Sequence, residues 1–134
     1  MPDDGLVTLK SSHDFATTLE RLTAALEAKG VRVFARIDHA AGATSAGLVL
    51  GPTTLVVFGN PVAGTPLMQA VQTAGIDLPL KALVWQDAQG AVHLTYNDPT
   101  WIAARHGLER TADQAVTAMA TGLAAFAQHA TGPG

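Results

Sequence analysis

Apolar side chains recur at helical spacing soon after the start of the chain. The intervals are four, three and four residues between Phe15, Leu19, Leu22 and Leu26. Such intervals place side chains on one face of a helix. Ser11, with Asp14 three residues later, forms a capping-box pattern in which Asp replaces the usual Glu, and Gly30 suits the left-handed residue that commonly ends a helix. The pattern therefore predicts a helix between Ser11 and Gly30.

Three further helices are predicted in the rest of the chain. Thr111 and Gln114 form a second capping box, followed by an alanine-rich segment with apolar residues at helical spacing, Val116, Met119, Leu123 and Phe126. Asp98 before Pro99 predicts the cap of a short helix that ends at Gly107.

The remaining predicted helix follows the block Phe58-Gly59-Asn60-Pro61. Asn60-Pro61 and Thr65-Pro66 each place a capping residue before a proline at a possible first helical position. The pattern predicts a short helix from about Pro66, or from an earlier start, up to Gly75.

Five segments have the composition of β-strands, and they cover residues 6–10, 31–39, 53–58, 81–86 and 91–96. The run from Thr53 to Phe58 is uninterrupted in its apolar and β-branched character, as in central strands. The last two segments flank residues 87–90 and predict a hairpin with a four-residue loop. In the segment 31–39, strict alternation would place Val33, Ala35 and Ile37 on one face, with His39 on the same side. The small residues 40–47 after it are expected to be flexible.

These elements predict one α+β domain in the order β-α-β-β-α-β-β-α-α, with helices over a mostly antiparallel sheet. We expect the domain to span residues 1–130 and residues 131–134 to form a flexible tail. A chain of 134 residues is long enough to bury one core without cross-links.

Composition narrows the classes of function. Apolar residues make up 48% of the chain and charged residues only 14%, an apolar excess that suggests an oligomer. The net charge of −3 and the eight Lys and Arg residues give no basic surface for nucleic acid. With zero cysteines, disulfides, thiolate metal sites and cysteine nucleophiles are excluded. No segment approaches the about 20 apolar residues of a membrane span, and the first residues lack a signal-peptide core, so we expect a cytoplasmic protein without a membrane partner.

Several spaced blocks resemble a known family. They are Arg36-Ile37-Asp38-His39-Ala40, Phe58-Gly59-Asn60-Pro61, Asp77-Leu78-Pro79-Leu80-Lys81, Tyr96-Asn97-Asp98-Pro99 and Ala104-Arg105-His106-Gly107-Leu108. In this order, over roughly residues 5 to 127, the chain resembles the bacterial and archaeal domain-of-unknown-function 302 family. The resemblance implies a compact α+β fold that is commonly a homodimer, and it implies no established activity.

Polar side chains gather where the apolar runs end, and we expect them to line one small-molecule pocket, because a rigid scaffold holds such loop residues in place. The candidates are His39, Asn60, Lys81, Tyr96, Asn97 and Asp98. A structural alternative stays open: Asn60 and Asp98 precede prolines as helix caps do, and in this alternative His39 is a structural residue satisfied by hydrogen bonds alone. No complete catalytic set and no nucleotide or serine-hydrolase motif is present, which favours a homodimeric binding module over an enzyme.

Haem is the alternative ligand. Haem requires a mostly apolar pocket and one or two axial ligands, for which His39, His93 and Met68 are the candidates. The chain has no Cys-x-x-Cys-His motif, so any haem would be bound non-covalently, in a carrier, a sensor or a redox protein. A symmetric dimer would double every ligand.

Overall fold

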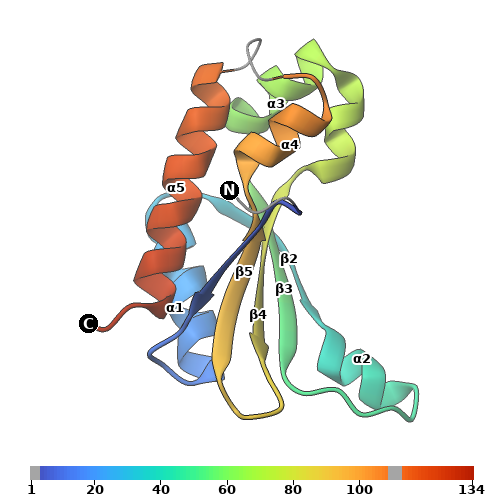
Figure 1. The fold of residues 1–134 in the computed structure, drawn as a ribbon, viewed down its shortest axis with the longest axis vertical. Helices are drawn as coiled ribbons and strands as arrows, with labels where there is room; N and C mark the ends of the chain where they lie inside the picture. The colour runs from blue at the N-terminus through green and yellow to red at the C-terminus, as the bar shows by residue number, and fades with distance from the viewer. Residues whose placement is uncertain (1–3, 109–112) are drawn as a thin grey trace.

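Five strands form one antiparallel sheet in the spatial order β1-β5-β4-β3-β2 (Figure 1). The strands are β1 (Leu6–Lys10), β2 (Arg32–Asp38), β3 (Thr53–Gly59), β4 (Leu80–Gln86) and β5 (Val92–Asn97). The computed structural model describes residues 4–108 and 113–134. The α+β class, the antiparallel sheet and the hairpin between β4 and β5 are confirmed.

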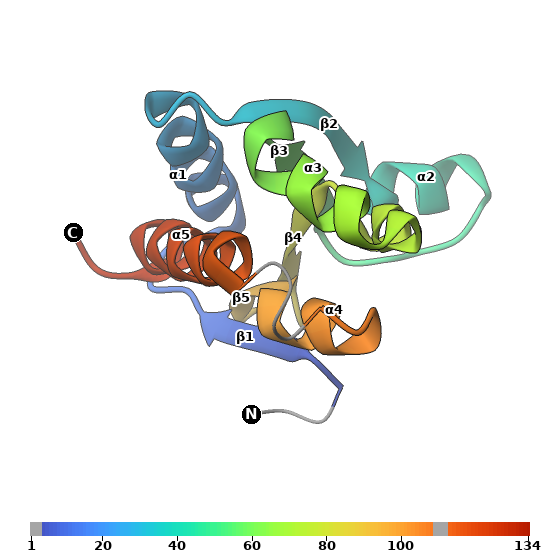
Figure 2. The ribbon, with the colours of Figure 1, turned by 90° about the horizontal axis from the view of Figure 1, so that it is seen from above.

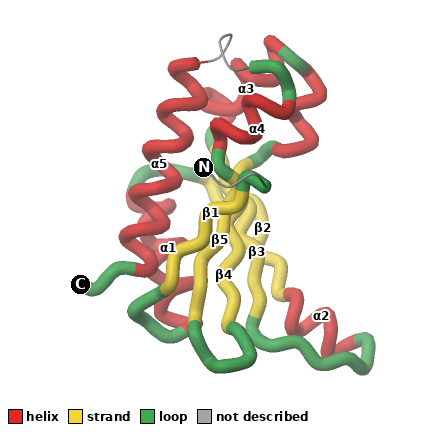
Figure 3. Tube along the Cα trace, in the orientation of Figure 1, coloured by secondary structure: helices red, strands yellow, loops and turns green. Residues whose placement is uncertain are grey.

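The helices divide into three groups around this sheet. They are α1 (Phe15–Ala28), α2 (His39–Ser45), α3 (Pro61–Ala70), the 3₁₀-helix η1 (Gln72–Asp77), α4 (Pro99–Arg105) and α5 (Asp113–Thr131). Figure 2 shows α1 and α5 side by side against one face of the sheet, with α2 on the opposite side. In Figure 3, α3, η1 and α4 group beyond one end of the strands, and α2 projects from the other end. None of the helices in residues 4–108 and 113–134 combines the length and apolar character that crossing a membrane requires.

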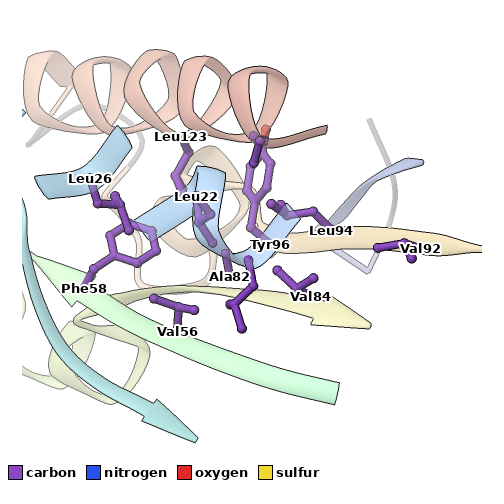
Figure 4. Packing of buried hydrophobic residues seen from close by; sticks show 13 residues of the cluster. Leu22, Leu26, Val56, Phe58, Ala82, Val84, Val92, Leu94, Tyr96 and Leu123 are labelled. Atoms are coloured by element: carbon purple, nitrogen blue, oxygen red, sulfur yellow. The ribbon is translucent and has the colours of Figure 1, made fainter. Parts of the chain in front are cut away.

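The main core lies between the sheet and helices α1 and α5 (Figure 4). Every second residue of β3 is buried, as alternation of side chains along a strand requires, and the same alternation continues in β5. The central buried side chains are Leu22, Leu26, Val56, Phe58, Ala82, Val84, Leu94, Tyr96 and Leu123. The side chains between them on the strands point to the other face, where they are only half-buried.

Helix α1 begins later than the capping box predicted. The carboxylate of Asp14 accepts a hydrogen bond from the amide of Thr17 at 2.8 Å and is the N-cap, so the prediction of Ser11 as the cap is wrong. The hydroxyl of Ser11 instead lies 2.6 Å from that of Thr18. The end of the helix is confirmed: Gly30 has φ of 70°, and the amide of the next residue bonds back to the carbonyl of Leu26.

Strand β2 contains a bulge that changes which side chains share a face. Val33 pairs with Phe58, which is in the core, whereas Ala35 pairs with Val57, so Phe34 is an extra residue. Val33 therefore faces the core, and Ala35 and the residues in step with it face the other side. The predicted common face for Val33 and Ala35 is wrong, because strict alternation does not anticipate an inserted residue.

The segment after β2 is helical. Asp38 accepts a hydrogen bond from the amide of Ala41 at 2.9 Å and caps α2, so His39 begins a helix and does not end a strand. The flexible connection expected over residues 40–47 is replaced, as far as Ser45, by this short helix.

Two other element boundaries differ from expectation. Helix α3 is capped by Asn60, carries Pro66 inside it and ends at Ala70, after which the chain tightens into η1. Helix α5 includes Thr131, the residue at which we expected the flexible tail to begin. Thr131 is buried, and its carbonyl accepts a hydrogen bond from the amide of Ser12 at 2.7 Å. The capping residue Thr111 lies outside the described residues.

Candidate functional site

Five of the six predicted ligand-binding residues lie at one end of the sheet. Strands β3 and β5 end where β4 begins, because both run antiparallel to β4. This places Asn60, Lys81, Tyr96, Asn97 and Asp98 at the same end. His39 lies at the opposite end, exposed on the first turn of α2. The structure therefore brings five of these residues to one region and separates His39 from them.

Several of these residues have structural roles of the kind the sequence allowed. Asn60 caps α3, and Asp98 caps α4 by accepting hydrogen bonds from the amide and hydroxyl of Thr100. The side chain of Tyr96 is in the core, and burial, with a smaller effect of the nearby Asp98 carboxylate, raises the pKa of its phenol. The ammonium group of Lys81 donates to the carbonyl of Pro79 at 3.1 Å.

A pocket of about 320 Å³ lies next to this end of the sheet, between α3, α5, the bulge of β2 and the first residues of β4. Its lining is mainly apolar and comprises Phe34, Gly59, Asn60, Pro61, Ala63, Gly64, Thr65, Met68, Leu78, Pro79, Leu80 and Met119. Only Asn60 and Met68 were candidates from the sequence. The other lining residues carry no chemical signature, and they are brought together only by the packing of four separate segments.

Asn60 and Thr65 supply polar side chains to the lining of the pocket. The Oδ1 atom of Asn60 accepts the amide of Val62 at 2.9 Å as part of the helix cap. Its amide nitrogen makes no hydrogen bond to another residue in the described part of the chain, and it is a donor. The pocket is therefore mainly apolar, with hydrogen-bonding groups of Asn60 and Thr65 in its lining.

A charged cluster beside the pocket was not foreseen from the sequence. The carboxylate of Asp77 in η1 lies 2.6 Å from Nε2 of His106 and 3.0 Å from NH1 of Arg105, both at the end of α4. Asp77 and His106 are largely buried, whereas Arg105 is half exposed and lies over the ring of Trp101. The cluster fastens η1 to α4, and the next residue, Leu78, is part of the pocket wall.

The signal for this cluster was present in the sequence, although it could not be interpreted there. Asp77 and the pair Arg105-His106 belong to two of the blocks that carry the family resemblance. Asp77 and Arg105 are 28 residues apart in the sequence, and only the fold shows that the carboxylate of one block meets the guanidinium and the imidazole of the other.

His93 lies on the face of the sheet away from α1 and α5. Its ring stacks on Trp85 with centroids 4.4 Å apart, and Nε2 lies 2.9 Å from the carboxylate of Asp87 in the hairpin loop. The hydrogen bond with His93 is the largest of the effects that hold the pKa of Asp87 below its ordinary value, and the amides of Ala91 and Gln89 add to it.

The three candidate haem ligands do not gather at one place. Met68 lines the pocket, His93 stacks on Trp85 in the β4–β5 hairpin, and His39 starts α2. Within residues 4–108 and 113–134, no group of three or more His, Asp or Glu side chains is arranged to hold a metal ion.

Comparisons with known proteins agree on the fold. The family model described as "Domain of unknown function DUF302" matches residues 7–126. A crystal structure of an uncharacterised conserved DUF302 protein from Bacillus stearothermophilus superimposes with a TM-score of 0.84 over 94% of this chain and 98% of that one, at 20% sequence identity.

Two curated relatives are closer in sequence and longer. Proteins named "Fluoride-specific ion channel FluC 1" from Brucella suis and Brucella abortus are each 51% identical over 130 residues, or 97% of this chain. The match covers 51% of the first protein and 48% of the second, so the chain spans about half the length of these relatives.

The Asp77 cluster should contribute measurably to stability. Asp77→Asn removes the negative charge that faces Arg105 and His106, and we expect the free energy of unfolding to fall by about 1–3 kcal/mol, as for hydrogen bonds to charged groups. Urea denaturation at neutral pH measures the change. Asp98→Asn is the matched control and should be nearly neutral, since Asn caps helices as well as Asp does. Equal stability of both variants and the wild type would show that the cluster contributes nothing.

The Asp87–His93 pair should make the free energy of unfolding depend on pH. Because the pKa of Asp87 is lower in the folded chain, the ionised carboxylate stabilises the fold above about pH 4, where unfolded Asp is also ionised. This contribution is lost as the pH falls through the folded pKa. Asp87→Asn should therefore lower the free energy of unfolding at pH 6.5, and the difference from the wild type should shrink by pH 3. A difference that is the same at both pH values would contradict the assignment.

Proposed function

We propose that this chain, which belongs to the family described as domain of unknown function DUF302, is a binding module for a small, largely apolar molecule. The observation that carries the proposal is the pocket between α3, α5 and the ends of β3 and β4. Its volume of about 320 Å³ is at the lower end of the range of ligand sites, about 300–1,000 Å³. The ligand is accordingly smaller than a typical drug molecule.

The chemistry of the lining supports a particular class of ligand. Phe34 offers an aromatic ring, and Met68 and Met119 offer flexible, polarisable thioethers that adapt to irregular apolar shapes. Asn60 places a hydrogen-bond donor at the rim. We expect an aromatic or branched hydrocarbon skeleton with one carbonyl or hydroxyl oxygen.

The haem alternative stays a second ligand hypothesis, with less support from the geometry, because Met68 is its only candidate axial ligand in the pocket. The homodimer and the cytoplasmic location expected from the sequence also stay predictions. Sedimentation of the purified protein and fractionation of cells that contain the tagged chain test them.

The methionines provide a direct test of the pocket. The chain has three, of which Met68 and Met119 line the pocket and Met1 does not. In protein labelled with ¹³C at the methionine methyl groups, titration with acetophenone or 1-naphthol should shift the signals of Met68 and Met119 saturably. A parallel titration with haem, read by visible absorption, should give no Soret shift that depends on His39 or His93.

A pair of glycine variants supplies the control for this titration. Gly64→Leu places a side chain at the pocket wall, where an added Cβ has ordinary contact, 3.8 Å from Leu78, and it should abolish the shifts. Gly122→Leu makes the same change on α5, where an added Cβ has no neighbour within 4 Å, and binding should persist. Shifts that survive Gly64→Leu, or no saturable shift with either probe in the wild type, would refute the proposal.

A second candidate function follows from the longer relatives. Proteins named as fluoride-specific ion channels contain a segment 51% identical to nearly all of this chain, which supports a role as a fluoride-responsive accessory domain. Helices α1 and α5 use their buried side chains to pack on the sheet of this domain, and α3, η1 and α4 pack with α5 in a second cluster, so we propose that the channel activity of the relatives belongs to their other half.

This candidate predicts a specific effect of fluoride. The midpoint of thermal unfolding should rise saturably with sodium fluoride and should not rise with sodium chloride at the same ionic strength, because an ion that binds only the folded state stabilises it. Identical midpoints in the two salts would rule out direct binding of fluoride.

A further inference from the structure

Arg32, the first residue of β2, lies at the edge of the pocket. In the register of the sheet it pairs with Gly59, a residue of the pocket lining. Residues directly opposite each other in an antiparallel pair share one face of the sheet. The side chain of Arg32 therefore lies on the face toward which a side chain at Gly59 would point.

The space in front of Gly59 shows what borders that face. A Cβ added there would lie 3.3 Å from Cβ of Pro79 and 3.5 Å from the ring of Phe34, and both residues line the pocket. The guanidinium carbon of Arg32 is 5.4 Å from the centroid of the same Phe34 ring, within the range of a cation–π contact. One wall of the pocket is thus an aromatic ring with a cation against it.

Arg32 has no anionic partner in the part of the chain that the structure describes. A guanidinium carries five N–H donors. Across residues 4–108 and 113–134, that of Arg32 forms no ion pair or hydrogen bond. The other charged residues between positions 28 and 37 are Lys29 and Arg36, both of them cations. The neighbours of Arg32 in the sequence therefore leave its charge uncompensated.

Two other cations at this end of the sheet already have oxygen partners. The ammonium of Lys81 donates to the carbonyl of Pro79 at 3.1 Å. The guanidinium of Arg105 lies 3.0 Å from the carboxylate of Asp77. Of these three cations, Arg32 is the one whose donors can serve a bound molecule.

The polar side chains of the pocket lining are compatible with the same kind of ligand. The amide nitrogen of Asn60 and the hydroxyl of Thr65 can both donate hydrogen bonds. An ionised carboxylate only accepts hydrogen bonds, and its two oxygens match the planar fork of a guanidinium. A carboxylate on an apolar body therefore suits both the donors and the apolar walls.

We propose that the pocket binds a small apolar carboxylic acid, whose hydrocarbon part contacts Phe34 and the two methionines and whose carboxylate pairs with Arg32. The inference rests on the proposed function and names the chemical group that its ligand carries. Arg32 is then the residue that makes the pocket prefer an anion to a neutral molecule of the same shape.

A matched pair of probes separates the effect of charge from that of shape. Phenylacetate and phenylacetamide are nearly equal in shape, and only phenylacetate is an anion at neutral pH. In protein labelled at the methionine methyl groups, both should shift the signals of Met68 and Met119 saturably. Phenylacetate should have a dissociation constant lower by about fivefold, the upper end of what exposed ion pairs give. Equal dissociation constants for the two probes overturn the proposal.

Arginine variants assign the preference to one position. Arg32→Met removes the charge and keeps a long side chain, so the preference should disappear while phenylacetamide still binds. Arg36→Met is the matched control and should keep the preference, because Arg36 pairs with Val56 on the core side of the same strand. The control matters because charged residues also protect edge strands such as β2 from pairing with other chains. A preference that survives Arg32→Met, or is lost in Arg36→Met as well, overturns the role of Arg32.

A lysine variant keeps the test decisive if Arg32→Met binds neither probe. Arg32→Lys retains the charge without the planar fork, and it should still prefer phenylacetate, by a smaller factor than the wild type. Equal affinities in Arg32→Lys would then overturn the proposal.

The same titrations tell a failure of this inference from a failure of the pocket. Saturable shifts with phenylacetamide, without tighter binding of phenylacetate, retain the proposed function and overturn the pairing of a carboxylate with Arg32. No shift with either probe in the wild type overturns both.

Discussion

The alternation of side chains between the two faces of the sheet is the constraint on which the rest of this structure depends. In β3, β4 and β5, one set of alternate residues is buried under α1 and α5, and the other set points away from them. On β3 and β4 the second set is also largely apolar, with Leu55, Val57, Leu83 and Trp85, whereas on β5 it consists of His93, Thr95 and Asn97. The chain supplies two long helices for one face and only a short projecting helix near the other. That imbalance explains the apolar excess of the composition and directs attention to a partner for the uncovered face.

The two ends of the sheet differ in the elements that adjoin them. At one end, α3 follows β3, η1 precedes β4 and α4 follows β5. Asn60 caps α3, Asp98 caps α4, and the Asp77 cluster joins η1 to α4. This framework leaves the apolar pocket between α3 and α5. At the other end, the hydrogen bond between Asp87 and His93 fixes the hairpin loop, and α2 projects away from the sheet. The pocket and α2 therefore lie at opposite ends of the sheet and share no residue.

The comparisons concern the fold of this chain and the longer proteins in which a similar segment occurs. A protein with the same fold is itself uncharacterised, and the closer relatives contain this domain as about half of a longer chain named as a fluoride channel. The matched segment has a hydrophobic core of its own between the sheet and helices α1 and α5, as an independently folding domain requires.

The sequence by itself determined the class of the fold, most of the elements and the hairpin, because the periods of two and of about 3.6 residues and the residues at turns are local signals. It also identified Asn60 and Asp98 as residues of helix starts, since capping depends on immediate neighbours. Only the tertiary structure decided that Phe34 forms a bulge, that His39 lies far from Asn60, and that Asp77 meets His106. These outcomes depend on strand register and on the meeting of segments about 20 to 30 residues apart, and no local pattern encodes either one.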